Sequence, residues 1–337
     1  MIKKFNENYI YQPKKKLNIS EIVDGISNAN LAILSQAITL LESKRKEDKA
    51  LVYASLSKLP PSDHKSFRIG ITGSPGVGKS TFIETFGKYI SSLGISVAVL
   101  TIDPSSKING GSILGDKTRM EELSKDSNVF IRPSPSKGKL GGVGEQSYES
   151  ILLCEKAGFD VILIETVGVG QNEISVSEMV DFFLLLKISG SGDELQGIKR
   201  GIIEMSDLIA INKCDGNNIE NSEKSKNEFQ LALKLFPKKN SEWIPKVLTC
   251  SSTNGMGLKE IWTNIEIYTE LTKKNNYFFK NRINQNKFWL RQIINESIQR
   301  NFYENFSVKK ELKKQLKKIE ECKTSVFEAS QAILASK

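Results

Sequence analysis

The chain alternates between two hydrophobic patterns. Short runs that are apolar at most positions are typical of strands buried on both faces of a parallel sheet. These runs occupy residues 67–73, 95–103, 128–132, 160–165, 181–188, 207–212 and 246–250. Helix-compatible stretches separate them, at residues 145–157, 195–205, 219–236 and 257–274. The alternation predicts an α/β fold with a doubly wound, mostly parallel sheet, in which a ligand binds at the carboxyl ends of the strands.

Both ends of the chain have a helical pattern instead. Within residues 17–59, apolar side chains recur mostly at spacings of three and four, and Pro60-Pro61 then breaks the pattern. We therefore expect a helical N-terminal arm over residues 1–60, a central α/β domain over residues 61–275 and a helical extension over residues 276–337.

The C-terminal extension carries narrow apolar stripes. One stripe, from Leu290 to Phe302, repeats every four residues, and a second, from Val308 to Ile319, follows Ser307, which we expect to cap that helix. Stripes of this width can pack on the core or on a second copy of the chain. The pattern leaves both arrangements open, and we favour a dimer contact.

One stretch combines a strand, a glycine-rich turn and the start of a helix. Residues 67–81 match the P-loop pattern G-x-x-x-x-G-K-[ST]. The glycines let backbone N–H groups close around phosphate oxygens, while Lys79 reaches the β- and γ-phosphates and Ser80 can bind Mg²⁺. The alternative is a glycine-rich turn without a ligand, but chance rarely supplies the pattern together with its strand and helix. The predicted phosphate-binding residues are Gly73, Ser74, Pro75, Gly76, Val77, Gly78, Lys79, Ser80 and Thr81.

A second motif predicts which base is bound. Asn212-Lys213-Cys214-Asp215 ends an apolar strand and fits the guanine-reading pattern N-K-x-D. The Asp215 carboxylate can accept hydrogen bonds from the N1–H and 2-amino groups of guanine, which adenine does not offer in that arrangement. Asn212 can contact the base edge, and the Lys213 stem can cover the ring. We therefore expect GTP rather than ATP; the alternative is that Asp215 caps a helix. The loop at residues 250–255 resembles the one that completes a guanine pocket, through Ser251, Ser252 and Thr253.

Three acidic residues at strand ends or in loops are candidate magnesium ligands. Asp103, Asp116 and Glu165 lie between the two nucleotide motifs. Mg²⁺ usually takes one or two carboxylates together with nucleotide phosphates and several waters. We expect these carboxylates to share the ion with Ser80. The alternative, that they only cap loops, is weakest for Glu165.

Glu165 also begins a segment expected to sense the γ-phosphate. Gly168 stands where many GTPases have the glycine of D-x-x-G, but valine follows it instead of the glutamine that orients water in Ras-type enzymes. Hydrolysis is therefore expected to be slow until another group assists it. The glycine-punctuated, charged segment 190–199 can supply that group, although Asp193 alternatively starts a helix. The predicted catalytic residues are Lys79, Glu165, Asp193 and Lys199.

Composition changes this picture little. The net charge is +9, much of it from Lys14–Lys16 and residues 309–318, but no recognisable nucleic-acid-binding module accompanies it, so we expect no nucleic-acid partner. No run approaches about 18 uninterrupted apolar residues, so we expect no membrane association. The polar segment Met1–Lys16 lacks the apolar core of an export signal, and the four cysteines are widely spaced. These features favour a protein of the reducing cytoplasm.

Taken together, the motifs resemble those of the MeaB family of P-loop GTPases, which is related to the methylmalonic aciduria type A protein and also labelled ArgK. The resemblance runs from about residue 20 to the end of the chain. Its most specific part is Gly110-Gly-Ser-Ile-Leu-Gly-Asp-Lys-Thr-Arg-Met120, which is hard to find elsewhere. The other matching segments are residues 36–43, 73–80, 103–106, 165–171 and 192–199.

The resemblance implies a GTPase chaperone that works with an adenosylcobalamin-dependent acyl-CoA mutase, usually methylmalonyl-CoA mutase. In this family the GTP or GDP state gates cofactor loading and protects the mutase, and the mutase stimulates hydrolysis. The match further implies a magnesium and switch region at Asp103, Asp116 and Glu165, and a partner-responsive switch at residues 190–199. Family members are typically homodimers through their C-terminal helices. The Lys-rich N-terminus and tail depart from the family pattern.

Three other functions fit parts of the sequence. A nickel metallochaperone GTPase would share the P-loop, but the chain has a single histidine, His64, and no paired cysteines to bind the metal. A kinase that phosphorylates a transport protein is the function that the ArgK label suggests. A non-enzymatic binding module would use GTP only to lock a conformation.

Overall fold

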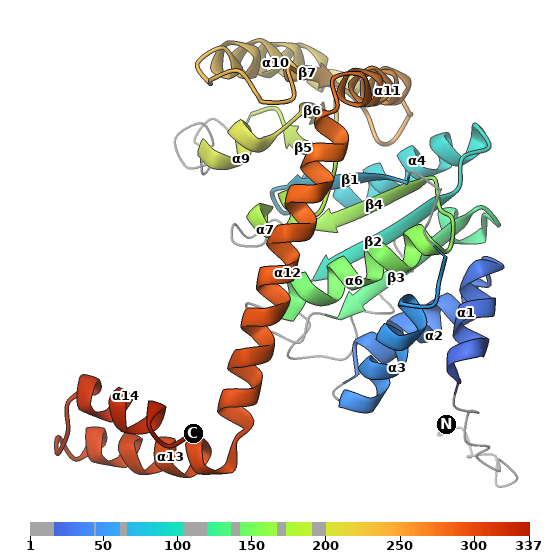
Figure 1. Ribbon diagram of the computed structural model, residues 1–337. Coiled ribbons are helices and arrows are strands. Elements are labelled where there is room, and N and C mark those ends of the chain that lie inside the picture. The colour runs from blue at the N-terminus through green and yellow to red at the C-terminus, as the bar shows by residue number, and fades with distance from the viewer. Residues whose placement is uncertain are drawn as a thin grey trace, which may run out of the picture.

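A parallel sheet forms the centre of the protein, as Figure 1 shows. The computed structural model describes residues 17–43, 45–60, 66–103, 120–135, 142–166, 173–190 and 200–337. Within these ranges seven strands pair in the order β3-β2-β4-β1-β5-β6-β7, and every pairing is parallel. They are β1 (Phe67–Gly73), β2 (Val97–Asp103), β3 (Val129–Pro135), β4 (Val161–Thr166), β5 (Phe182–Ile188), β6 (Leu208–Asn212) and β7 (Lys246–Thr249). The predicted fold class is confirmed.

Helices cover both faces of this sheet because successive strand residues point to opposite faces. On one face, Val97 and Val99 pack with α4 (Lys79–Ser92) and α11 (Leu258–Lys274). On the other, Ala98 and Leu100 pack with α6 (Gly142–Lys156). The short helices α7 (Glu173–Ser177) and α9 (Arg200–Met205), together with α10 (Ile219–Leu233), cover the remainder. The near-continuous apolar runs of the sequence follow from burial on both faces.

Three helices precede the sheet, as the sequence predicts. They are α1 (Ile19–Ser27), α2 (Leu31–Leu41) and α3 (Lys46–Leu56), and they lie outside α6 (Figure 1). Asn18 begins α1 with a capping box completed by Glu21, and the Asn30 side chain caps α2. The apolar positions Ile22 and Ile38 are fully buried, so this unit is fixed to the core by its apolar face.

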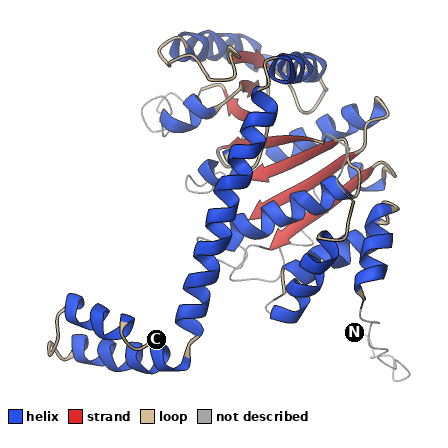
Figure 2. Cartoon of the chain, in the orientation of Figure 1, coloured by secondary structure: helices blue, strands red, loops and turns tan. Residues whose placement is uncertain are grey.

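A single long helix, α12 (Tyr277–Glu304), leaves the core and ends in a hairpin of α13 (Phe306–Glu320) and α14 (Val326–Leu334), which projects away from the sheet (Figure 2). Asn305, not Ser307, caps α13: the Asn305 side chain accepts a hydrogen bond of 2.8 Å from the Ser307 N–H. The prediction of Ser307 was wrong because α13 already begins at Phe306.

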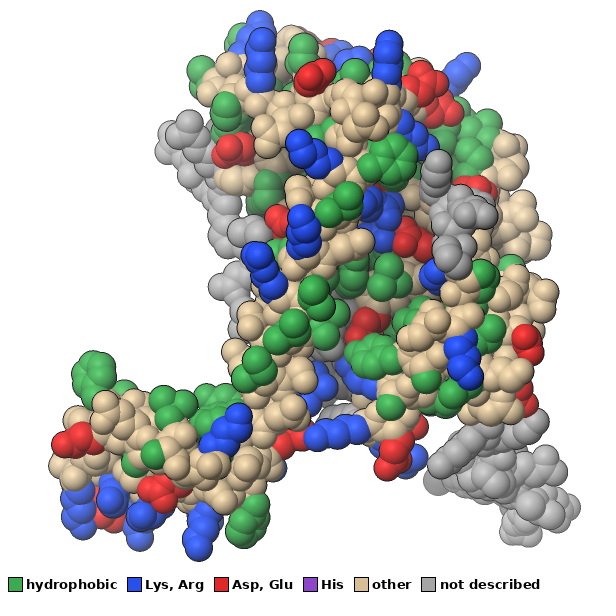
Figure 3. Space-filling model, in the orientation of Figure 1, with side chains coloured by type: hydrophobic (Ala, Val, Ile, Leu, Met, Phe, Trp, Pro, Cys, Tyr) green, Lys and Arg blue, Asp and Glu red, His purple; other side chains and the backbone are tan. Residues whose placement is uncertain are grey.

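Two faces of α12 have different surroundings. Trp289 is buried and donates from its indole N–H to the Glu178 carbonyl at 2.8 Å. The predicted stripe lies on the other side, where Leu290, Ile294 and Ile298 are 59%, 47% and 57% exposed. Figure 3 shows hydrophobic side chains along this helix. In the described part of the chain the stripe therefore does not pack on the core.

A buried ion-pair network anchors α12 to the starts of β1 and β5. The Arg282 guanidinium bonds to the Asp181 carboxylate, to Glu155 Oε1 at 2.7 Å and to the Ser66 carbonyl at 2.8 Å. Arg68, on β1, shares Glu155 through two further bonds of 2.8 and 2.7 Å. Burial alone would raise the pKa of Glu155, but the two arginines outweigh it and hold that pKa below its usual value.

The four cysteines are free thiols, of which Cys322 alone is exposed. Among the described helices, none has the length and hydrophobicity needed to cross a membrane.

Candidate nucleotide-binding site

The P-loop lies between the end of β1 and the start of α4. Gly76 and Gly78 have φ angles of 81° and 91°, in the left-handed region that favours glycine. At Gly73 an added Cβ would lie 2.6 Å from the Leu186 carbonyl oxygen of β5, so this glycine is required by close packing. The loop therefore has the tight backbone that can place N–H groups around an anion.

Two side chains at the start of α4 face this loop. The Lys79 ammonium donates to the Gly73 carbonyl at 2.7 Å and to the Ser74 carbonyl at 3.1 Å. The Ser80 hydroxyl donates to Glu165 Oε1 at 3.2 Å. Glu165, near the end of β4, is buried, with 7% exposure. The structure thus brings Glu165 next to Ser80 and the P-loop, although 85 positions separate the two residues in the sequence.

The Ser80 and Glu165 oxygens suit a magnesium ion. Neighbouring ligands of an octahedral Mg²⁺ lie about 2.9 Å from each other, because each bond is about 2.0–2.1 Å long. The observed separation of 3.2 Å is close to that value. Both groups are hard oxygen donors, which Mg²⁺ prefers. Among the described residues, no group of three or more acidic, histidine or cysteine side chains is arranged to hold a metal ion by itself.

Asn212 connects the P-loop with the base-recognition loop. Its amide nitrogen donates to the Val77 carbonyl at 2.9 Å. Its amide oxygen accepts from the N–H of Ser252 at 3.1 Å and from the Ser252 hydroxyl at 2.8 Å. Because Asn212 is only 1% exposed, these bonds are shielded from water. One side chain therefore fixes the phosphate-binding and base-binding loops relative to each other.

Lys213 lies across the P-loop. It has a φ angle of 60°, which is uncommon for a residue with a side chain, and its ammonium donates to the Gly76 carbonyl at 2.9 Å. The Asn218 side chain holds the strained turn by donating to the Lys213 carbonyl at 2.8 Å. The Lys213 stem is thus held beside the glycine-rich turn, where it can cover a bound base.

Asp215 lies next to the second loop. Its carboxylate accepts a hydrogen bond from the Ser251 hydroxyl, and Ser251 itself is fully buried. Asp215 stands at the N-cap position of η2 (Gly216–Asn218), but its side chain makes no capping hydrogen bond there. The Asp215 side chain therefore does not cap η2, and the N-cap residue of α10 (Ile219–Leu233) is Asn218.

Two cysteines of this region are structural. The backbone N–H of Cys214 donates to the Cys250 carbonyl at 2.9 Å, joining the loops that follow β6 and β7. Burial, together with a smaller effect of the neighbouring Cys214, raises the pKa of the Cys250 thiol to about 12. Cys250 therefore stays a neutral thiol at physiological pH.

Comparison with known proteins agrees with this geometry. Residues 34–307 match the family described as methylmalonyl Co-A mutase-associated GTPase MeaB. The chain belongs to this family. It is 43% identical to the GTPase ArgK of Escherichia coli over 287 residues, which are 85% of this chain and 87% of that protein.

Two further relatives align with nearly the whole of this chain. The mouse protein named methylmalonic aciduria type A homolog, mitochondrial, is 41% identical over 316 residues, 91% of this chain and 76% of that one. A crystal structure described as LAO/AO transport system kinase superposes with a TM-score of 0.74 at 33% identity, covering 95% of this chain and 99% of that one. The chain is therefore a GTPase of the MeaB family, with the GTP binding that this implies.

Some predicted residues of this MeaB-family GTPase fall outside the described ranges. They are Asp116, Asp193 and Lys199. For Asp103 the backbone alone is described, at the end of β2. Thr101 of β2 pairs with Glu165 of β4, so both strands end at the same edge of the sheet, which is the edge that holds the P-loop.

Two contacts at the site were not predicted. The Thr85 hydroxyl of α4 donates to the Ser252 carbonyl at 2.7 Å, a second link between the P-loop helix and the base loop. The Ser189 hydroxyl, just after β5, donates to Asn218 Oδ1 at 2.7 Å. No sequence motif signals either contact, because each depends on which loops the fold brings together.

Proposed function

We propose that this GTPase is a nucleotide-dependent chaperone of an adenosylcobalamin-dependent acyl-CoA mutase, with methylmalonyl-CoA mutase as the first candidate client. The nucleotide part of the proposal is supported by the hydrogen bonds of Asn212 to both Val77 and Ser252, which join the P-loop to the loop after β7. The family description and the name of the mouse relative support the choice of client.

The proposed reaction is attack of water on the γ-phosphate of GTP. Lys79 leaves the Gly73 and Ser74 carbonyls and donates to the β- and γ-phosphates, while backbone N–H groups of the P-loop bind the same oxygens. Ser80 and Glu165 would hold Mg²⁺, which supplies charge stabilisation when bound. Asp103 and Asp116 are proposed to complete the magnesium region, and Asp193 and Lys199 to assist hydrolysis.

We further propose that the protein is a homodimer joined through residues 276–337. Four apolar side chains follow one side of α12 and are about half exposed, at Ile283, Leu290, Ile294 and Ile298. A second copy of the helix would cover this stripe in the manner of a helix pair. Analytical ultracentrifugation checks this, since Ile294→Asp should yield a monomer.

The central experiment measures phosphate release from GTP by the purified protein, alone and with methylmalonyl-CoA mutase. Slow hydrolysis that the mutase stimulates supports the proposal, and Lys79→Ala should abolish both rates. Comparable turnover of ATP would contradict the guanine assignment. Transfer of labelled γ-phosphate to a protein, instead of release to water, would favour the transport-kinase alternative that the name of the similar crystal structure suggests.

A further inference from the structure

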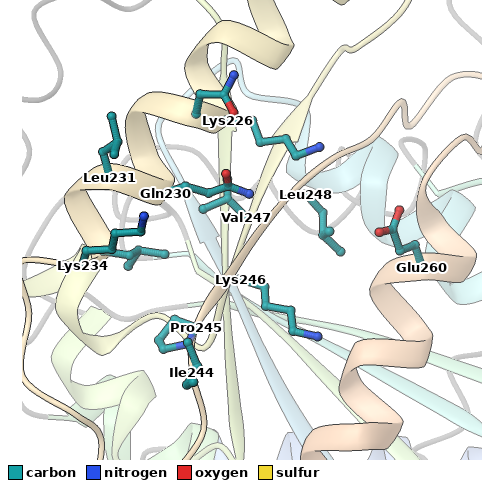
Figure 4. A pocket seen from close by; sticks show the side chains of 12 residues that line it. Lys226, Gln230, Leu231, Lys234, Ile244, Pro245, Lys246, Val247, Leu248 and Glu260 are labelled. Carbon is teal, nitrogen blue, oxygen red and sulfur yellow. The ribbon is translucent and has the colours of Figure 1, made fainter.

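A groove lies beside β7, the edge strand opposite β3, outside the nucleotide pocket (Figure 4). Its volume is about 620 Å³. The second half of α10 forms one wall, Glu260 of α11 stands on the opposite side, and the floor includes Val247 and Leu248. None of the residues assigned to nucleotide binding lines this groove.

The apolar part of the groove is open to solvent. Its floor is well buried, with Val247 and Leu248 at 1% and 8% exposure, but Leu231 and Ile244 on its walls are 63% and 78% exposed. A small-molecule site would enclose its ligand within largely buried walls. Large apolar side chains that stand exposed above an apolar floor instead mark a surface that a protein partner covers.

The edge of β7 does not accept an added strand. The Cys250 N–H bonds to the Ile211 carbonyl and the Cys250 carbonyl accepts from the Cys214 N–H, both at 2.9 Å. Because backbone groups alternate in direction along a strand, those of Val247 point away from β6. Val247 is only 1% exposed, so an extended peptide has no access to them. A helix laid between α10 and α11 is the peptide conformation that remains.

The charges around the groove select an acidic partner. Three lysines line it, Lys226, Lys234 and Lys246, against one carboxylate, Glu260. Lys226 is paired with Glu223 at 3.1 Å, so Lys234 and Lys246 are the two cations that can face a partner. Lys246 donates to the Asn264 side chain at 2.7 Å, which keeps its charge beside the floor. Lys234 makes no ion pair with any residue in the described part of the chain. A helix with Asp or Glu beside its apolar residues complements this surface.

We propose that the groove binds an acidic amphipathic helix of the client mutase. Its apolar residues pack on Leu231 and Ile244, and its carboxylates face Lys234 and Lys246. This inference rests on the proposed function and deepens it by naming the surface that holds the client.

The position of the groove connects it to the nucleotide. α10 follows Asp215 after a single turn, and β7 leads directly into the loop that contains Ser251. The Thr249 hydroxyl also donates to Glu223 of α10 at 3.0 Å, joining the two elements. A helix docked here contacts both segments that carry the guanine-reading residues, so client binding changes with the bound nucleotide.

The test uses full-length protein and purified methylmalonyl-CoA mutase, with GDP or a non-hydrolysable GTP analogue. The double variant L231D/I244D and the charge reversal K234E should each bind the mutase at least tenfold more weakly than wild type. The control is L93D, which places a single aspartate on a half-exposed leucine outside the groove. L93D should bind like wild type, and basal GTP hydrolysis should be unchanged in all variants.

The outcomes separate this inference from the proposed function. Wild-type affinity in both L231D/I244D and K234E would overturn the inference alone. Loss of binding in L231D/I244D with wild-type affinity in K234E would overturn the acidic character of the helix. Absence of mutase binding by the wild-type protein would overturn the proposed function and this inference with it. Hydrogen exchange in the complex should slow at residues 226–234 and 244–248, and protection elsewhere only would also overturn the inference.

Discussion

Replacing Asp215 by asparagine should convert the pocket from guanine to xanthine recognition. Asparagine has the same shape, and its amide oxygen can keep the hydrogen bond that the Asp215 carboxylate accepts from Ser251. The change therefore leaves the loop in place and alters only the groups that face the base. An N–H₂ donor then meets the 2-amino group of guanine, whereas xanthine has a carbonyl oxygen at that position.

The expected loss follows from the hydrogen bonds involved. A hydrogen bond to a charged group contributes about 1.5–3 kcal/mol, and guanine would lose the one from its 2-amino group, while its N1–H can still donate to the amide oxygen. At about 1.4 kcal/mol for each factor of ten, GTP affinity should fall by about one to two orders of magnitude. Xanthosine triphosphate should recover most of this loss, because its O2 accepts from the new amide and its N1–H donates to the amide oxygen.

Isothermal titration calorimetry with GTP, xanthosine triphosphate and ATP measures these affinities directly. Glu220→Gln is the matched control, since it removes an exposed carboxylate from the start of α10 and should leave GTP affinity unchanged. A fall in GTP affinity of less than about tenfold, or equal affinities of the variant for GTP and xanthosine triphosphate, would refute base reading by Asp215.

Three further changes test the rest of the structure. Asn212→Ala leaves the Val77 carbonyl and the Ser252 N–H without partners, so chemical denaturation should show a loss of at least about 2 kcal/mol; a neutral result would contradict the link between the loops. Ser80→Ala should raise the Mg²⁺ concentration needed for half-maximal GTP hydrolysis, and Ser80→Thr should restore it. Arg282→Met should cost about 3–5 kcal/mol of unfolding free energy, unlike the exposed Arg291→Met on the same helix. Because the folded-state pKa of Glu155 lies below the ordinary 4.5, Glu155 stabilises the fold fully above about pH 4.5 and loses that contribution as the pH falls. In Arg282→Met this loss of stability should begin at a higher pH, which measuring the free energy of unfolding as a function of pH would show.

The sequence was most informative where a local pattern has one structural solution. The continuous apolar runs gave the parallel strands, and the glycine spacing of the P-loop matches the positive φ angles of Gly76 and Gly78. The pairing of Ser80 with Glu165 was also expected, since both were candidate magnesium ligands. In each case the chemistry of a few neighbouring residues constrains the backbone.

Contacts between segments that are distant in the sequence could not be predicted from it. Thr85 and Ser252 meet although 167 positions separate them, and neither residue type signals the contact. The same holds for Arg282, whose carboxylate partners come from the end of α6 and the start of β5. The Ser307 prediction failed differently, because two polar residues compete for the start of α13 and the position of the first turn decides between them.

The attachment of α12 limits how the C-terminal helices can influence GTP. Arg282 bonds near Arg68 at the foot of β1, whereas Gly73 lies at the other end of that strand, about 17 Å away at about 3.3 Å per residue. A partner that binds the projecting hairpin therefore acts on the edge of the sheet remote from the triphosphate. Such binding can alter hydrolysis only by shifting whole strands along their axes, so a client that accelerates turnover needs a second contact beside the nucleotide.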